Sequence, residues 1–298
     1  MITLITLNYN DFESTTSFIE NVKNMECLDK ILVVDNNSSD GSYDKLCIYK
    51  NDKIHVIKSD KNRGYGAGNN YGIKYAISHW NSDFIIISNP DVVFSENVVK
   101  KIIQCMIQNS DIAICSATMV DSKERIYTNF ASDLPKYSDL ILSCFQGIVQ
   151  FRNKIMHHSE YPSYSRIKDK DVFYTDVVPG SFFVARRTPM EDVGFFDEKT
   201  FLYYEENILA YKLKQNGYKE AILPSEKYYH LHSVSIDKNI KKHFTRSKIM
   251  LNSAKVYLSI IGTNKFNICI YELLYWIGFP ERFIFSKLSK IIKKIGGG

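Results

Sequence analysis

The sequence lacks both the cysteine spacing of a metal site and the leader of a secreted chain. Its six cysteines are scattered without paired spacing, and several sit inside apolar runs where a thiol behaves as a small hydrophobe. The first residues form an apolar run, 2–7, with no basic leader and no small-residue cleavage site. We therefore expect a cytoplasmic protein.

Long apolar runs and a strong excess of one charge are also absent. The apolar residues between 256 and 285 are interrupted before they reach the roughly 20 that a membrane span requires, so we expect no transmembrane helix. The net charge is only +5, and basic residues are not interleaved with aromatic ones in a compact patch. We therefore expect no nucleic-acid partner.

Apolar residues make up 45% of the 298 positions, which is enough for one large core with or without a small appendage. Short continuous apolar segments occur at 2–7, 31–34, 54–57 and 84–87. Each is followed by polar or glycine-bearing residues and then by a helix-like stretch. Continuous rather than alternating hydrophobicity predicts strands covered on both faces, as in a doubly wound α/β fold with a mostly parallel sheet.

Polar side chains follow three of these segments. Asn8 comes after the first, Asp35 after the second, and Asn89 and Asp91 after the fourth. Because ligands bind at the carboxyl ends of the strands in such sheets, we expect these residues to converge on one crevice. For the segment 35–42 a capped turn that opens a helix is the alternative, since Asp and Asn are ordinary turn residues.

A glycine-rich segment, 62–72, follows the third predicted strand and opens a helix. Its glycines, Gly64 among them, let a ligand approach the backbone, and exposed amides at the helix start suit a diphosphate or a ribose. The segment lacks the Gly-Lys-Ser/Thr ending of a Walker loop, and it does not follow the first strand as the dinucleotide fingerprint does. We therefore expect neither a Walker loop nor a Rossmann dehydrogenase.

The ordered motifs resemble glycosyltransferase family 2, and within it the rhamnosyltransferase-like members. They are Asn-Tyr-Asn at 8–10, Val-Val-Asp-Asn-Asn-Ser-Ser-Asp-Gly-Ser at 33–42, the loop 62–70 and Asn-Pro-Asp at 89–91. Together with motifs further along, they carry the likeness over roughly the first four fifths of the chain, and several motifs in order are more specific than one. The resemblance implies a GT-A fold, with a Rossmann-like, mostly parallel sheet flanked by helices, and a C-terminal helical extension.

The resemblance also implies a division of the chain. A GT-A catalytic domain would occupy 1–235, with a nucleotide-sugar half up to about residue 120 and an acceptor half after it, and a helical region would occupy 236–298.

For the donor, the resemblance assigns residues at the strand ends and in the loops. Asp35 would accept a hydrogen bond from the imide of uracil or thymine, and Asn8, Asn62 and Asn69 would complete base and ribose recognition. Gly180, in a Gly-Ser pair, would line the donor-sugar site. For each asparagine, a bond that satisfies only the local backbone is the alternative.

Asn89 and Asp91 stand where the family has its Asp-x-Asp motif, with one carboxylate fewer. Such an oxygen-rich pair suits Mg²⁺ or Mn²⁺ bridging the donor diphosphate, where the metal neutralises charge on the departing nucleotide. His230 matches the family's metal-proximal histidine and could complete the metal shell or bond the diphosphate. A strand-end turn capped by Asp91 is the alternative.

Glu205 and Glu206 stand where the family usually has Glu-Asp at the start of a helix. Inverting transfer needs one carboxylate to take the proton of the acceptor hydroxyl as its oxygen attacks the anomeric carbon. Glu206 aligns with the family's base, and Glu205 remains an alternative. A solvated helix N-terminus, where acids favour the positive end of the helix dipole, is the non-catalytic interpretation.

The last stretch predicts a basic amphipathic helix. Ile284, Leu288, Ile291 and Ile295 recur at helical spacing, and lysines occupy much of the remaining surface. Such a helix can lie on an anionic membrane, or it can pack its apolar stripe on the catalytic domain. Both alternatives stay open, and the first would place the protein peripherally on the inner face of the plasma membrane.

The resemblance thus implies a metal-dependent, inverting hexosyltransferase that takes dTDP-rhamnose or a UDP-hexose and extends a bacterial surface polysaccharide on a glycan or lipid-linked acceptor. A non-catalytic nucleotide-sugar-binding protein stays open, because Asn89 and Glu206 both depart from the commonest family letters. A nucleotidyltransferase is the weaker alternative, since the segment 7–10 carries no Lys or Arg for phosphates.

Overall fold

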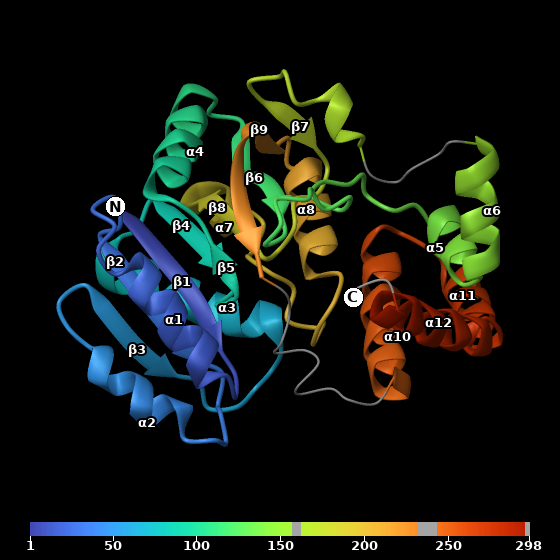
Figure 1. Cartoon of the computed structure of the whole chain (residues 1–298), viewed down its shortest axis with the longest axis horizontal. Helices are drawn as coiled ribbons and strands as arrows, with labels where there is room; N and C mark the ends of the chain where they lie inside the picture. Colours follow the sequence, from blue (N-terminus) through green and yellow to red (C-terminus); the bar gives the residue numbers. More distant parts are fainter. Residues whose placement is uncertain (157–161, 232–242, 296–298) are drawn as a thin grey trace.

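The centre of the computed structural model, which describes residues 1–156, 162–231 and 243–295, is a mixed β-sheet (Figure 1). Within those residues the strands lie in the order β3-β2-β1-β4-β8-β6-β9-β5, and β7 pairs with β9. Their bounds are β1 (Ile2–Asn8), β2 (Lys30–Asp35), β3 (Ile54–Lys58), β4 (Phe84–Ser88), β5 (Val92–Val93), β6 (Ile112–Val120), β7 (Phe173–Thr175), β8 (Phe182–Arg186) and β9 (Lys219–His230).

The N-terminal half of the sheet is parallel. β1 pairs in parallel with β2 and β4, and β2 pairs in parallel with β3. These strands are the four continuous apolar segments, and from Ile31 to Asp35 every residue of β2 is buried. The α/β architecture with flanking helices is therefore confirmed.

Beyond β4 the sheet becomes mixed. β8 lies antiparallel between β4 and β6, while β9 runs parallel to β6 and antiparallel to β5 and β7. The predicted parallel arrangement thus holds for β1 to β4 and for the β6–β9 pair, whereas β8, β5 and β7 pair antiparallel with their neighbours. Hydrophobic continuity reports that a strand is buried on both faces, but it carries no information about the direction of its neighbour.

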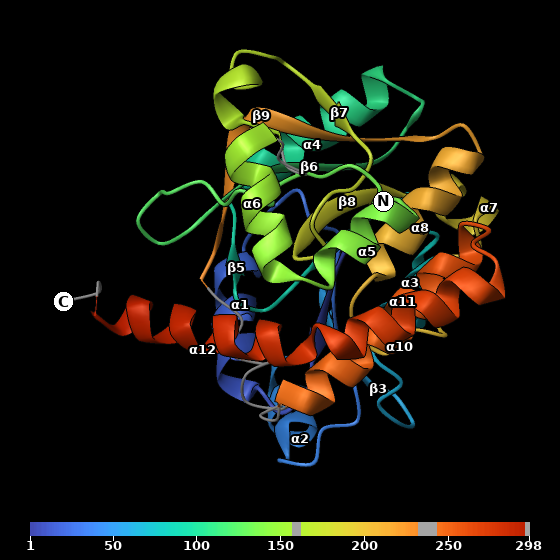
Figure 2. The same cartoon turned by 90° about the vertical axis from the view of Figure 1, so that its right-hand side faces the viewer.

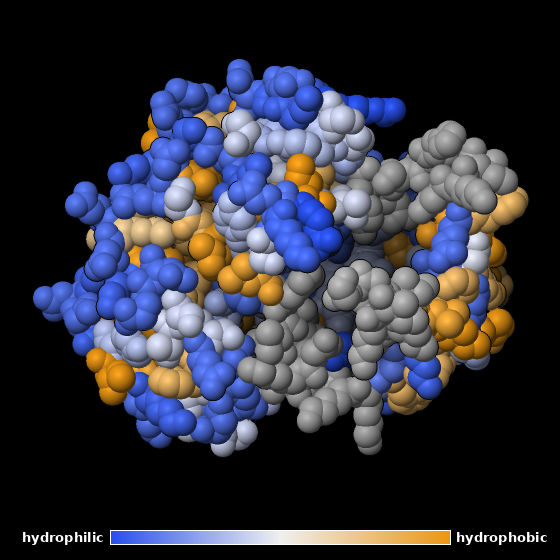
Figure 3. All heavy atoms as spheres, in the orientation of Figure 1, coloured by the Kyte–Doolittle hydropathy of each residue, from blue (hydrophilic) through white to orange (hydrophobic). Residues whose placement is uncertain are grey.

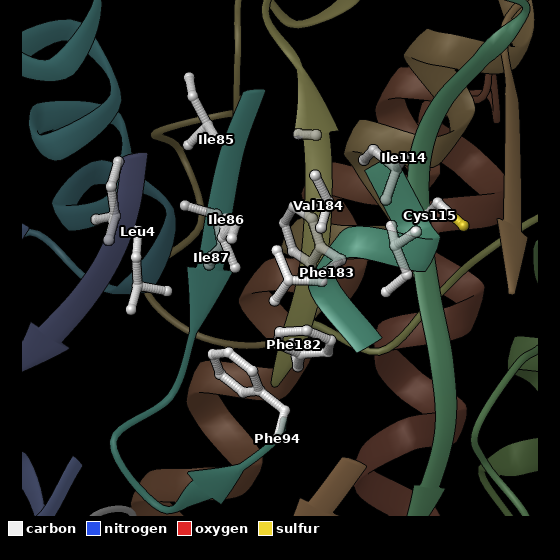
Figure 4. Packing of buried hydrophobic residues seen from close by; sticks show 14 of the residues in the cluster. Leu4, Ile85, Ile86, Ile87, Phe94, Ile114, Cys115, Phe182, Phe183 and Val184 are labelled. Atoms are coloured by element: carbon white, nitrogen blue, oxygen red, sulfur yellow. The ribbon is translucent and has the colours of Figure 1, made fainter. Parts of the chain in front are cut away.

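Apolar side chains of the four central strands interlock in the core (Figure 4). Ile86 and Val184 are opposite each other across the β4–β8 pair, and Phe94 packs on Phe182 with ring centroids 4.5 Å apart. This packing fixes the carboxyl end of β4 against the start of β8, where the amide of Asn89 donates to the carbonyl of Ser181 at 2.8 Å.

Helices flank the sheet and are capped locally. α4 (Glu96–Gln108) begins at Ser95, whose hydroxyl accepts a bond from the amide of Val98. The other helices of this part are α1 (Phe12–Val22), α2 (Ser42–Leu46), α3 (Tyr65–Trp80), α7 (Arg187–Asp192) and α8 (Glu205–Gln215), with 3₁₀ turns η1 (Cys47–Tyr49) and η2 (Tyr164–Arg166).

A helical unit lies beside the sheet, as predicted for the C-terminal region. It comprises α5 (Tyr137–Ser143), α6 (Gln146–Met156), α10 (His243–Ile260), α11 (Lys265–Ile277) and α12 (Phe279–Ile295). α5 and α11 share one apolar cluster with α10, so part of the segment between β6 and β7 packs with the C-terminal helices. In the described ranges, every helix is too short or too polar to cross a bilayer.

Candidate active site

One pocket of about 400 Å³ gathers residues from distant segments at the carboxyl side of β4. It contains five residues that the sequence singled out, Asn89, Gly180, Glu205, Glu206 and His230. Its remaining wall is formed by Tyr65, Met119, Asn129, Ser132, Val177, Val178, Pro179, Ser181, Leu202, Tyr203 and Asn207. Motifs more than 100 residues apart in the sequence thus share one cavity.

Glu205 and Glu206 are the first two residues of α8, and the two residues before them have an unusual backbone conformation. Tyr203 and Tyr204 have φ of +75° and +66°, a left-handed conformation that bulky residues rarely adopt and that clusters at functional sites. Glu205 is only 1% exposed, and its Oε1 has no hydrogen-bond partner among the described residues. Burial, together with the charge of Glu206, raises the pKa of Glu205 to about 8. Glu205 therefore favours its neutral, protonated form more strongly than an exposed glutamate does.

Glu206 faces the Gly180 backbone inside the pocket. A Cβ on residue 180 would lie 2.7 Å from Cδ of Glu206, well inside contact distance, so this position admits only glycine while the carboxylate stays in place. Burial raises the pKa of Glu206 as well. Both carboxyls of the acidic pair therefore hold a proton more tightly than exposed glutamates do.

Tyr65, which sequence reasoning did not select, closes the pocket from the glycine-rich segment. Its hydroxyl donates to the carbonyl of Gly180. Burial, with the charges of Glu206 and Glu205, holds its pKa well above the usual value, so it acts only as a neutral donor. The available signal was its place directly after Gly64, at the start of α3.

Asp91 forms a second pair with His230, and of these two residues His230 lines the pocket. β5 and β9 pair so that Val92 is opposite His230, and Nε2 of His230 lies 3.4 Å from Oδ2 of Asp91. The amide of Leu231 donates to the carbonyl of Asp91 at 2.9 Å and fixes the two backbones. Both side chains are partly buried.

This pair fits a divalent cation held jointly with a ligand. A carboxylate oxygen and an imidazole nitrogen are both Mn²⁺ ligands, and Mg²⁺ or Mn²⁺ bound to nucleotides commonly takes few protein ligands plus phosphate oxygens and water. No group of three His, Cys, Asp or Glu ligands occurs among the described residues. A metal here would therefore depend on oxygens brought by the ligand.

Asp35 and Asn8 lie at the adjacent ends of β2 and β1, and neither lines the pocket that contains the acidic pair. Asp35 accepts hydrogen bonds from Nδ2 of Asn8 at 2.7 Å and from the amide of Ser38 at 2.9 Å. Asn8 Oδ1 accepts from the Thr15 hydroxyl at 2.9 Å. Both residues are fully buried, so in the free protein Asn8 positions Asp35 and the adjoining turn.

Asn62, Gly64 and Asn69 shape the glycine-rich segment. Oδ1 of Asn62 accepts from the Gly64 amide at 2.9 Å, and Nδ2 of buried Asn69 donates to the Tyr65 carbonyl at 3.2 Å. Gly64 has φ of +102°, and a Cβ there would lie 2.6 Å from Cα of Phe201. These residues therefore bring the segment close to the loop that precedes the acidic pair.

A smaller hollow of about 170 Å³ lies on the other side of this segment. It is lined by Asn36, Arg63 and Lys74, among others, and Asn36 donates to both the Gly64 carbonyl and the Asn62 side chain. Asn36 was overlooked because it is one of several polar residues after β2, and only the fold shows which of them faces the loop.

The chain matches the family model for glycosyl transferase family 2 over residues 3–194. A low-salt glycan biosynthesis hexosyltransferase from Haloferax volcanii is 24% identical over 216 residues, 72% of this chain and 62% of that protein. An N-acetylglucosaminyl-diphospho-decaprenol L-rhamnosyltransferase from Mycobacterium tuberculosis is 22% identical over 228 residues, 72% of this chain and 70% of that protein. The chain thus spans less than two thirds of the Haloferax relative.

Solved structures share the fold. GalNAc-T7 with UDP, GalNAc and Mn²⁺ aligns with a TM-score of 0.64 at 13% identity, over 87% of this chain and 47% of that one. TarS 1–349 of S. aureus aligns with a TM-score of 0.57 at 14% identity, over 96% of this chain and 73% of that one. With its GT-A fold and its rhamnosyltransferase relatives, the chain belongs to glycosyltransferase family 2.

Proposed function

We propose that this glycosyltransferase is metal-dependent and inverting, and that it moves rhamnose from dTDP-rhamnose, or a hexose from a UDP-sugar, to a hydroxyl of a glycan or lipid-linked saccharide in bacterial surface polysaccharide synthesis. The names of the Mycobacterium relative and of a Shigella flexneri dTDP-rhamnosyl transferase, 22% identical over 76% of this chain, support rhamnose. The Mycobacterium name also supports a lipid-linked acceptor.

The observation that carries the proposal is the shared pocket. It puts the acidic pair, the Gly180 backbone and the Asn89 to His230 rim around one cavity. A donor sugar in that cavity would have a carboxylate on one side and the diphosphate ligands on the other. A displacement at the anomeric carbon would require that arrangement, because the base and the leaving group act on opposite sides.

Glu206 is the proposed base. Its carboxylate takes the proton of the acceptor hydroxyl while that oxygen forms a bond to the anomeric carbon, and the bond from that carbon to the diphosphate breaks with its electron pair going to the nucleotide. Glu205, protonated in the same pocket, spares the site a second negative charge. The raised pKa of Glu206 makes it a stronger base than an exposed glutamate.

Asp91 and His230, with Asn89 beside them, would hold Mg²⁺ or Mn²⁺. When bound, the cation supplies charge neutralisation for the departing diphosphate. The backbone pairing of β5 and β9 keeps the two side chains next to each other before any ligand arrives. Two structural neighbours, GalNAc-T7 and a mannosyltransferase from Pyrobaculum calidifontis, are complexes with Mn²⁺, which supports the same use here.

Asp35 is the proposed reader of the uracil or thymine imide, with Asn8 holding it and with Asn62, Gly64 and Asn69 shaping the wall for the ribose and diphosphate. Asp35 has no exposed surface in the free protein. Contact with a base therefore requires the turn after β2 to shift. The enzyme would act at the cytoplasmic side, where nucleotide sugars are its donors.

A nucleotide-release assay tests the proposal. The full chain is incubated with UDP-, dTDP- and GDP-sugars, with Mn²⁺, Mg²⁺ or EDTA, and with a saccharide acceptor. We expect release from one donor, dependent on metal, and lost in Asp91→Ala and Glu206→Gln. Glu191→Gln, an exposed acid on α7, is the matched control and should keep full activity. Nucleotide binding without release from any donor would instead indicate a non-catalytic binding protein.

A further inference from the structure

Helix α11 turns an apolar stripe to solvent. Phe266, Leu273 and Ile277 are 73%, 62% and 56% exposed, and their spacing of seven and four residues places them on one side of the helix. The opposite side carries Tyr271 and Tyr275, which are buried in the helical unit. The helix is therefore apolar on both sides, unlike an ordinary surface helix, whose outer side is polar.

Neighbouring helices extend this surface. On α12, Ile284 and Leu288 are exposed one turn apart, and on α6 Ile148 and Phe151 are exposed. α11 and α12 cross the same side of the molecule in Figure 2, and apolar atoms gather along the right-hand rim, over α11, in Figure 3. The apolar face is defined by Ile148, Phe151, Phe266, Leu273, Ile277, Ile284 and Leu288. Contiguous exposed apolar patches mark interaction sites.

The charged residues around the apolar face have an excess of positive charge. The two acids between residues 265 and 295 are both engaged within the protein, Glu272 with Nζ of Lys255 at 2.5 Å and Glu281 with the amide of Gly147 at 2.7 Å. Lys265 and Lys287 are exposed. After Glu281 the sequence contains only basic charged residues, Arg282, Lys287, Lys290, Lys293 and Lys294.

We propose that the apolar face docks on an anionic lipid bilayer, with its large apolar side chains in the headgroup boundary and its lysines among lipid phosphates. The depth is interfacial, because the described helices cannot span a bilayer. A second copy of the chain fits less well, since a two-fold contact would set the same basic helices against each other. The predicted stripe residues Ile291 and Ile295 have side chains outside the described ones.

The helical unit is also fixed to the loop that carries the acidic pair. The Ser253 hydroxyl on α10 donates to the carbonyl of Leu202 at 2.8 Å, and the ring of Tyr257 stacks on Tyr204 with centroids 5.5 Å apart. Docking would therefore hold the pocket at a set height above the bilayer, where a lipid-linked saccharide is presented. Lipid binding itself goes beyond the proposed function and needs no particular sugar.

Vesicle sedimentation of the full chain tests the proposal. Phosphatidylcholine vesicles are compared with vesicles that also contain phosphatidylglycerol, at low and high salt. We expect binding to the anionic vesicles that weakens with salt, and roughly a tenfold lower partition coefficient for Leu273→Glu/Ile277→Glu. The matched control is Ile48→Glu/Ile107→Glu, whose positions are 77% and 65% exposed on the nucleotide-sugar half. It should bind as the unaltered chain does.

Two results would overturn the proposal. One is equal binding by the α11 variant and the control; the other is no binding of the unaltered chain to anionic vesicles. A dimer seen by analytical ultracentrifugation and lost only in the α11 variant, without vesicle binding, would assign the face to a second copy. Nucleotide release in detergent-free buffer is measured in parallel, so failure of lipid binding and failure of sugar transfer are read separately.

Discussion

The Glu206 carboxylate fills the space that a side chain at Gly180 would need. Tyr65 holds the other side of the same glycine through its carbonyl. The short Val177 to Ser181 segment is therefore positioned between a hydrogen-bond donor from α3 and an acid from α8. A substitution at residue 180 should consequently change the position of the proposed base.

Gly180→Ala should displace the carboxylate and lower kcat by at least about tenfold, because a positioned base contributes roughly 10² to 10⁴. The added methyl group meets the far end of a flexible side chain, so the melting temperature should change little. Steady-state nucleotide release and thermal denaturation measure the two effects. In Gly180→Ala/Glu206→Asp the acid is one methylene shorter, and activity should recover several-fold relative to Gly180→Ala; no recovery would show that the loss has another cause.

Glu205 should make stability depend on pH in a defined direction. Its pKa is about 8 in the folded protein and near 4.5 when unfolded, so between these values the folded state binds more protons. Its contribution is fully present below pH 4.5 and is lost as the pH rises through 8. Glu205→Gln, which resembles the protonated form, should therefore gain melting temperature relative to the unaltered chain as the pH goes from 6 to about 9. If the melting temperatures of Glu205→Gln and of the unaltered chain changed equally with pH, the raised pKa of Glu205 would be contradicted.

Substitution of the two glutamates should have different effects on kcat. We expect Glu206→Gln to lose about 10² to 10⁴ in kcat, whereas Glu205→Gln, which keeps a neutral side chain of the same shape, should stay within about tenfold. Single-turnover rates with saturating donor provide the measurement. The reverse order would make Glu205 the base.

Metal affinity should depend on Asp91 and His230. We expect Asp91→Asn and His230→Ala each to weaken Mn²⁺ binding in the presence of nucleotide diphosphate by about ten- to a hundredfold, as loss of a metal-site residue typically does. Titration followed by electron paramagnetic resonance detects the bound ion. Asp111→Asn, which alters a partly exposed acid paired with Lys219, is the control; an equal loss there would point to a general effect of charge.

Asn8→Ala should act first on stability. The change leaves the buried Asp35 without its 2.7 Å donor and the Thr15 hydroxyl without its acceptor, at a cost of about 1–3 kcal/mol in the free energy of unfolding. Denaturant unfolding measures this. The exposed Asn97→Ala on α4 should cost far less, and an equally mild result for Asn8→Ala would show that the network contributes little.

Sequence patterns were sufficient for β1 to β4 and for the family, because four continuous apolar segments and four ordered motifs are local features. They did not show that β8 inserts antiparallel beside β4, since strand direction depends on long-range packing. The sequence also did not show that the two adjacent glutamates, Glu205 and Glu206, have different surroundings. Two identical neighbours in the sequence differ only in how the folded chain around the start of α8 buries each of them. Tyr65 lines the pocket because Gly64 lets its segment approach the backbone of Phe201, which is also a property of the fold.

The close approach of Gly64 to the backbone of Phe201 implies that these two positions differ in their tolerance to substitution. The contact runs through backbone atoms at 201, where the carbonyl accepts a bond from the Tyr65 amide at 2.9 Å, and the Phe201 side chain itself is 42% exposed. A library of substitutions would therefore accept many residues at the aromatic position and almost none at the glycine. We therefore expect the Phe201 side chain to be dispensable and Gly64, which has no side chain, to be the constrained position.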